Sequence, residues 1–247
     1  EADPTFDIEG VDAGHKITIL ASIAFGIPIN FKATYVEGIS NLEQKDIMYA
    51  EDLGYKIKLL GITKCFNEIV EQRVHPTLIP KNQLVANVDG AMNAVLVQGN
   101  KVGPTLYYGA GAGSEPTASA VVADIIDLAR NIESNNANSI PILGFIKDEI
   151  KAKKILLIED ITSEFYIRLS MKNESGVLDK ITQVFAQHSL SINAMVQKEI
   201  QDDDVVDIIL VTSNIIEKEM EKIIYEIEAL PENIDKAIKL RIEQLNS

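Results

Sequence analysis

Hydrophobic residues recur with helical spacing in three parts of the chain. From Ile17 the run ITILASIAF is apolar on nearly every face, which predicts a deeply buried helix with Asp12 as its N-cap. The segment QKDIMYAEDL, at 44–53, predicts a second helix, and Gly54 follows it at the position that glycine favours after a helix end. The run TASAVVADIIDLARNI, at 117–132, predicts a third helix with a polar side.

Between the second and third helices the hydrophobic period falls to two. Four stretches show this alternation and are separated by proline and glycine: YKIKLLGIT, EIVEQRVHPTLI, NAVLVQG and VGPTLYYG. Alternation with this punctuation is typical of strands that are hydrogen-bonded in a mostly antiparallel or mixed sheet. Residues 1–133 are therefore predicted to form one α+β unit.

The segment 134–163 is predicted to be a linker and connecting segment, because SNNANS is polar and KDEIKAKK is charged. From 164 to 247 the chain alternates in one compact order. Strand FYIRLSMK leads through NESG to helix VLDKITQVFAQH, then come strands INAMVQKEI and VVDIILVTS, helix EKEMEKIIYEIEAL and strand AIKLRIE. This βαββαβ order predicts a second unit of the ferredoxin-like class.

The charge and composition of the chain exclude several classes of function. The formal net charge is −14, so the surface repels phosphate backbones, and a nucleic-acid or anionic-membrane partner is not expected. No apolar run approaches the roughly 18–20 residues that span a bilayer. The single cysteine, Cys65, excludes an intramolecular disulfide and fits a cytoplasmic location. The opening EADPTFDIEG carries no targeting signal and resembles the middle of a longer protein.

The densest group of ionisable residues lies at the start of the chain. Five carboxylates, those of Glu1, Asp3, Asp7, Glu9 and Asp12, precede Lys16. Asp12 and Lys16 are spaced i, i+4, so they share one helix face and can form an ion pair. From spacing alone, a helix cap and a surface ion pair of under about 0.5 kcal/mol would explain them.

The string DPTFDIEGVDAGHK, from Asp3 to Lys16, resembles the signature of the homoserine dehydrogenase family, D-P-x-x-D-[apolar]-x-G-x-D-x-x-x-K, at every fixed position. The resemblance continues through YVEGIS at 35–40, RVHPTLIPK at 73–81, NVDGAMNAV at 87–95 and GPTLYYGAGAG at 103–113. It covers nearly all of residues 1–132. The unit from 165 onward resembles an ACT domain, an amino-acid-sensing module that follows the catalytic part in bacterial members of this family.

The resemblance implies a function and a set of site residues. It implies NAD- or NADP-dependent interconversion of L-aspartate 4-semialdehyde and L-homoserine, in the biosynthesis of threonine, methionine and isoleucine. Lys16 would be the catalytic proton donor, and Glu1, Asp7 and Asp12 would bind the substrate. Gly111 and Gly113 would lie against the cofactor. The sheet of the catalytic domain would mediate dimerisation, giving a homodimer or homotetramer.

One feature of the family is missing from this sequence. No strand–GxGxxG–helix unit is present, and GAGAG at 109–113 follows a strand but precedes Glu115 and Pro116. We therefore expect a fragment that lacks the main cofactor-binding domain and is inactive by itself. Two alternatives stay open: a non-catalytic amino-acid-binding regulatory protein, and the tail of a bifunctional kinase–dehydrogenase, which the position of the ACT domain disfavours.

Threonine is the expected effector of the second unit. The turn NESGV places Asn173, Gly176 and Val177 at a helix N-terminus, whose N–H groups favour a carboxylate. Asn193 on the next strand is expected to hold the other polar groups of the effector. The alternative is a sheet that only dimerises. No metal site is expected, because His15, His75, His188 and Cys65 lack partners at ligand spacing.

Overall fold

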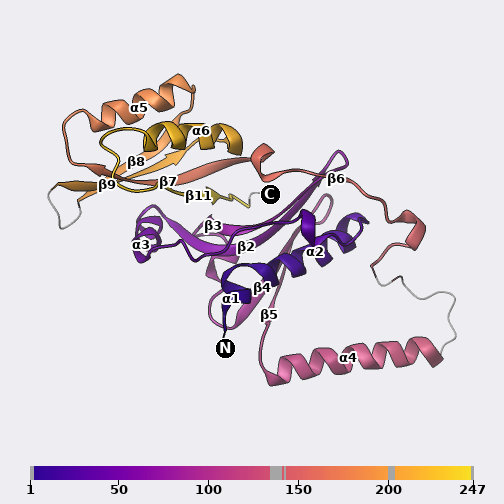
Figure 1. Ribbon diagram of the computed structural model, residues 1–247. Helices are drawn as coiled ribbons and strands as arrows, with labels where there is room; N and C mark the ends of the chain where they lie inside the picture. The colour runs from indigo at the N-terminus through magenta and orange to yellow at the C-terminus, as the bar shows by residue number, and fades with distance from the viewer. Residues whose placement is uncertain (1–2, 134–140, 142, 200–203, 246–247) are drawn as a thin grey trace.

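The computed structural model describes residues 3–133, 141, 143–199 and 204–245, and its elements surround one large mixed sheet (Figure 1). The helices of the N-terminal part are α1 (Thr5–Ile8), α2 (Val11–Phe25), α3 (Gln44–Asp52) and α4 (Ser114–Glu133). Its strands are β1 (Tyr35–Val36), β2 (Tyr55–Phe66), β3 (Ile69–Pro80), β4 (Met92–Gly99), β5 (Gly103–Ala110) and β6 (Lys154–Ile155). Short 3-10 turns lie at Phe31–Ala33, Val85–Asn87, Lys147–Glu149 and Ile158–Asp160.

The C-terminal part follows the βαββαβ order, as predicted. Its elements are β7 (Thr162–Lys172), α5 (Val177–Gln187), β8 (Ile192–Glu199), β9 (Val205–Thr212), β10 (Ile215–Ile216), α6 (Glu217–Glu228) and β11 (Ile238–Ile242). The strands lie side by side in the order β11-β7-β9-β8, and each neighbouring pair is antiparallel. Helices α5 and α6 cover one face of this sheet (Figure 1).

The two parts share a sheet, which the sequence did not predict. β3 pairs with β11 in parallel, with Arg241 opposite Thr77 and Ile242 opposite Leu78. The full order is therefore β1-β3-β11-β7-β9-β8, and β2 pairs with β3 along its whole length. The predicted strands NAVLVQG (93–99) and VGPTLYYG (102–109) do not join this sheet and form a separate two-stranded sheet, β4–β5.

Residues of β7 alternate between two cores, because successive side chains of a strand point to opposite faces. Phe165, Ile167 and Leu169 pack with α5 and α6, whereas Tyr166 packs with Ala50 of α3 and Leu78 of β3. The second core therefore consists of residues from both parts of the chain, and it fixes the ACT-like sheet against the N-terminal part.

Helix α2 corrects two of the sequence predictions. Its N-cap is Gly10, not Asp12, because the backbone there has φ +75°, a conformation that glycine adopts without a Cβ penalty. Asp12 lies in the first turn instead. Only one face of the helix is buried, since Ile19 and Ile23 on the outer face are 45% and 44% exposed.

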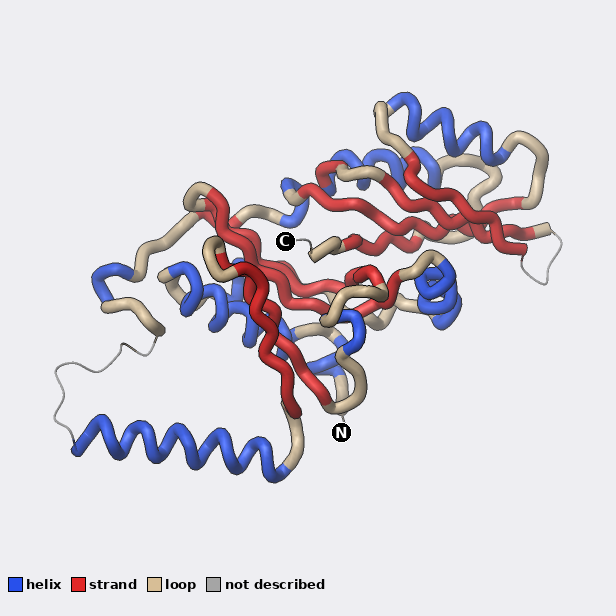
Figure 2. The backbone as a smooth tube through the Cα atoms, turned by 180° about the vertical axis from the view of Figure 1, so that it is seen from behind, coloured by secondary structure: helices blue, strands red, loops and turns tan. Residues whose placement is uncertain are grey.

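Helix α4 extends away from the sheet, and both ribbon views show it apart from the other elements (Figures 1 and 2). It begins three residues before the predicted 117–132 and ends at Glu133. The helix is amphipathic, yet its apolar side chains are exposed to solvent: Val121, Val122, Ile125, Ile126, Leu128 and Ile132. An apolar helix face of this extent normally packs against another element.

Candidate active site

The acidic segment folds into a short helix, a glycine turn and the start of α2. Asp7 lies in α1, and its carbonyl accepts the N–H of Gly10 at 3.0 Å, which closes the turn. The positive φ at Gly10 then lets α2 begin at the next residue. Asp7 and Asp12 are therefore held on either side of one tight turn. Glu1 lies outside the described residues.

Asp12 and Lys16 form the predicted ion pair between Nζ and Oδ2. The side chains of Lys16 and Asp12 are 63% and 33% exposed, and they share the outer face of α2 with Ile19 and Ile23. A lysine and a carboxylate on an open face can bind a polar ligand and exchange a proton with it. An exposed pair of this kind adds little to stability.

Gly111 and Gly113 lie in the turn between β5 and α4. A Cβ at Gly111 would lie 2.0 Å from the amide nitrogen of Asn93, so that side chain already fills the space. Gly113 has φ +123°, and a Cβ there would meet only Pro116, at 3.4 Å. Of the two glycines, Gly113 leaves more room for a ligand to approach the backbone.

The β7–α5 turn forms one wall of a cleft of about 240 Å³. Asn173, Gly176 and Val177 all line it, and Gly176 has φ +92° as the N-cap of α5. The same cleft is lined by Gln197 of β8, which sequence analysis did not single out.

Asn193 is not brought to this cleft. It lies at the start of β8, and its amide donates to the carbonyl of Thr212 at 3.1 Å. Gln197 pairs with Ile208 near the other end of the strand. Within one chain, therefore, Gln197 rather than Asn193 faces the β7–α5 turn.

Two buried charge clusters join the parts of the chain, and sequence analysis missed both. In the first, Arg168 of β7 donates to Asp46 of α3 at 2.6 and 3.1 Å, and to Glu43 at 2.8 Å. Burial opposes the charge of Arg168, but the hydrogen bonds and charges of Asp46 and Glu43 outweigh it and raise its pKa. An arginine within the apolar strand FYIRLSMK was the available signal.

In the second cluster, Arg241 of β11 donates to both oxygens of Glu217, at 2.8 and 2.7 Å. It also donates to Glu37, in the loop after β1, at 2.8 Å. Burial would raise the pKa of Glu217, but Arg241 and Lys239 outweigh it and hold that pKa below its usual value. Both arginines lie on strands of the C-terminal part and reach carboxylates of the N-terminal part.

The three histidines each contact neighbouring side chains. His75 is fully buried, where its ring contacts Arg73 and Thr77. His188 ends α5 and bonds Glu226 of α6 at 2.9 Å. His15 packs edge-on against Phe31, with the ring centroids 4.3 Å apart. Within the described ranges, no group of three or more histidine, cysteine or carboxylate side chains could hold a metal ion.

None of the helices in the described part of the chain combines the length and apolar character that crossing a membrane requires.

Comparison with known proteins identifies both parts of the chain. The sequence profile of the homoserine dehydrogenase family matches residues 1–126, and that of the ACT domain matches residues 165–232. Homoserine dehydrogenase of Neisseria gonorrhoeae is 53% identical over all of this chain, and that of Pseudomonas aeruginosa is 49% identical. The chain covers 57% of the length of each, so it spans little more than half of these relatives.

Solved structures show the same similarity. A homoserine dehydrogenase from Thiobacillus denitrificans is 54% identical and superimposes with a TM-score of 0.92 over 100% of this chain and 56% of its own. The homoserine dehydrogenase of S. aureus at pH 6.0 is 30% identical, with a TM-score of 0.69 over the same shares of the two chains. The mixed-sheet fold followed by an ACT fold is thus confirmed.

Proposed function

Since the chain belongs to the homoserine dehydrogenase family, we propose that it forms the substrate-binding and regulatory parts of an NAD- or NADP-dependent homoserine dehydrogenase. The reaction interconverts L-aspartate 4-semialdehyde and L-homoserine, and the pathway is that of threonine, methionine and isoleucine. The observation that carries the proposal is the Asp12–Lys16 pair on the open face of α2, within the family signature. A cytoplasmic location goes with a biosynthetic enzyme of this kind.

Lys16 would act as the proton donor in the direction of aldehyde reduction. The bound nicotinamide supplies the hydride, and the alkoxide that develops needs a nearby proton or cation. The exposed ammonium of Lys16 can reach such an oxygen, while Asp12 orients the lysine through its carboxylate. In the reverse direction a neutral Lys16 would accept the proton of the alcohol.

Asp7 and Asp12, with Glu1, would bind the ammonium group of the amino-acid substrate. An ammonium ion donates to carboxylates in short, charge-assisted hydrogen bonds. The Gly10 turn supports this role, because it holds Asp7 and Asp12 close together along the chain while both remain accessible.

The cofactor would be held mainly by a nucleotide-binding domain that precedes this chain. The turn at 111–113 would contribute backbone groups near the nicotinamide, chiefly at Gly113, since Asn93 fills the space at Gly111. Two observations support a further domain: the chain spans about half of its relatives, and the apolar side of α4 is uncovered. We divide the chain into a catalytic unit (1–133), a connecting segment (134–163) and an ACT unit (164–247).

L-Threonine would bind at the β7–α5 turn as a feedback effector. Its carboxylate would meet the N–H groups of Gly176 and Val177, at the N-terminus of α5. Asn173 and Gln197 line the same cleft, and Asn193 would have to come from a second copy to take part. A homodimer or homotetramer, paired through the catalytic sheets, is part of this proposal.

The direct test compares the chain alone with the chain preceded by a nucleotide-binding domain. NADP⁺ or NAD⁺ reduction by L-homoserine is followed at 340 nm. We expect turnover only from the longer protein, because the chain alone has no complete site for the hydride acceptor. Turnover by the chain alone would contradict the assignment of cofactor binding to a separate nucleotide-binding domain. A folded but inactive longer protein would favour a purely regulatory function.

A further inference from the structure

The loop at 37–40 is fastened to the acidic segment of the candidate active site. Ile39 donates its N–H to the carbonyl of Ile8 at 2.9 Å, and the hydroxyl of Ser40 donates to the carboxylate of Glu9. At Gly38 a Cβ would lie 2.7 Å from the Cα of Glu9 and the carbonyl of Ile8, so the two backbones touch. The position of residues 8–10 therefore depends on the position of this loop.

The other end of the same loop is bonded both to β3, where the N–H of Glu37 donates to the carbonyl of Val74 at 2.9 Å, and to the ACT unit. Glu37 accepts hydrogen bonds at 2.8 Å from Arg241 of β11 and from the hydroxyl of Tyr35. The guanidinium of Arg241 also lies over the ring of Tyr35, with 5.3 Å from its carbon to the ring centroid. Arg241 is 3% exposed and is itself fixed by Glu217 at the start of α6. Because its charge is buried and bonded in this way, the Arg241 guanidinium has little freedom to move relative to Glu217.

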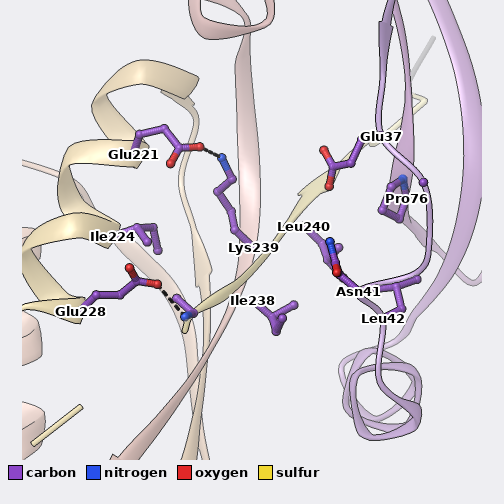
Figure 3. A pocket seen from close by; sticks show the side chains of 12 residues that line it. Glu37, Asn41, Leu42, Pro76, Glu221, Ile224, Glu228, Ile238, Lys239 and Leu240 are labelled. Carbon is purple, nitrogen blue, oxygen red and sulfur yellow. Dashed lines mark hydrogen bonds and ion pairs between the residues drawn. The ribbon is translucent and has the colours of Figure 1, made fainter. Parts of the chain in front are cut away.

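A cleft of about 290 Å³ separates the loop from α6 (Figure 3). Glu37, Asn41 and Leu42 line one side, Glu221 and Glu228 of α6 line the other, and Lys239 of β11 lies between them, paired with Glu221. Arg241 bonds both Glu217 of α6 and Glu37 of the loop, and so links α6 to the loop beside this cleft, which Glu37 lines.

We propose that Glu37 is a positioning residue: through Arg241, the ACT unit holds the 37–40 loop and so sets the place of the substrate-binding segment 7–12. The inference rests on the proposed function for the identity of the substrate. The path runs from Glu217 to Arg241 and Glu37, then through the loop backbone to Ile8, Glu9 and the Gly10 turn. Movement of β11 or α6 relative to the catalytic sheet changes the geometry of Asp7 and Asp12 by this path.

The test replaces Glu37 by glutamine in the enzyme that carries its nucleotide-binding domain. Glu37→Gln keeps the shape of the side chain but removes the charge that holds Arg241. We expect the KM for homoserine to rise about tenfold, while kcat and the KM for NADP⁺ change less than about threefold, because binding geometry rather than proton transfer is disturbed. A purely structural role would lower the amount of active enzyme without this selective change.

Glu243→Gln is the matched control. Glu243 follows β11 and pairs with Lys64 at 2.8 Å and with Arg73 at 3.3 Å, so it also joins the two parts of the chain, but it does not touch the 37–40 loop. We expect its KM for homoserine to match the wild type. Equal KM values for Glu37→Gln and the wild type, or equal increases in both variants, would overturn the proposal.

Amide hydrogen exchange provides a readout that does not require activity. Peptides covering residues 7–14 are expected to exchange faster in Glu37→Gln than in Glu243→Gln and the wild type. If the wild type has no turnover, the proposed function fails and this comparison alone decides the inference. If Glu37→Gln does not fold, Ser40→Ala at the other end of the path is expected to give the same exchange and KM changes, and unchanged values there would overturn it.

Discussion

At the scale of single residues, the candidate site depends on a lysine whose surroundings are open. Lys16 has a carboxylate neighbour and little burial, whereas the two arginines of the charge clusters are almost fully enclosed. The sequence predicted the Asp12–Lys16 pair because i, i+4 spacing determines which helix residues meet. It could not predict Gly10 as the N-cap of α2. By side-chain type Asp12 is the better N-cap, and the positive φ of Gly10 cannot be read from the sequence.

Lys16→Ala in the complete enzyme is expected to lower kcat by roughly 10²–10⁴-fold with a much smaller change in KM, because a general acid acts mainly in the transition state. Lys16→Arg is the matched variant: it can still pair with Asp12, but a guanidinium does not release its proton in the accessible pH range. Steady-state kinetics at saturating cofactor distinguish a proton donor, for which both variants lose kcat, from a residue that only pairs with Asp12, for which Lys16→Arg keeps kcat. Wild-type kcat in both variants would reduce Lys16 to a surface ion-pair residue.

His75 is expected to make stability depend on pH. Burial, together with the charges of Arg241 and Arg73, lowers its pKa well below 6.5. The unfolded chain therefore binds a proton more readily than the folded one once the pH falls below about 6.5, and stability is lost in that direction. The slope is at most about 1.4 kcal/mol per pH unit for one group. Urea unfolding at pH 7.0, 6.0 and 5.5 measures it.

His75→Gln removes this titrating group and should flatten the curve between pH 5.5 and 6.5. An unchanged slope in His75→Gln would mean that other groups account for the pH dependence.

At the scale of elements, hydrophobic periodicity predicted the helices and strands that bury one face against the rest of the protein. Strands 55–66, 69–80, 162–172 and 205–212 and helices α3, α5 and α6 all follow their apolar patterns closely. The pairing of β3 with β11 could not be predicted, because it is made by backbone groups that every residue carries. The outer face of α2 was predicted to be buried from its apolar residues, but within the described chain no element covers it.

L-Threonine is expected to raise the melting temperature of the protein. A ligand that binds only the folded state adds RT ln(1 + [L]/Kd), about 2.7 kcal/mol at a hundredfold excess over Kd. Gln197→Ala should weaken the shift, because Gln197 lines the cleft at the β7–α5 turn. Asn193→Ala is the matched variant and should leave the shift intact unless a second copy supplies that residue.

D-Threonine is the control ligand and should give no shift, since its groups cannot meet the same donors together. An unchanged melting curve at high millimolar L-threonine would leave the ACT unit as a pairing sheet without feedback control. The measurement also tests the choice between Gln197 and Asn193, which the sequence alone could not make.

At the scale of the whole molecule, the shared sheet and the two arginine clusters make one folding unit of two family domains. Arg168 is 2% exposed and Asp46 is completely buried, so their ion pair exists only while the ACT unit and α3 are packed together. Separation of the two units would leave both charges without their partner in an apolar surface. We therefore expect the units to unfold in a single transition.

Asp46→Ala is expected to cost about 3–5 kcal/mol of unfolding free energy, because it leaves the buried Arg168 with only the half-exposed Glu43 and the more distant Asp207, at 4.0 Å, as partners. Asp46 also belongs to the capping box of α3, whose loss alone costs about 1 kcal/mol. Asp52→Ala is the matched control: Asp52 pairs with Lys198 across the same two parts at 2.7 Å, but Asp52 is exposed and Lys198 is only partly buried, so a much smaller loss is expected. Urea unfolding followed by circular dichroism measures all three proteins. A loss near 1 kcal/mol for Asp46→Ala would assign the residue to the helix cap, whereas the larger loss places the buried ion pair among the contacts that hold the ACT sheet against the N-terminal part.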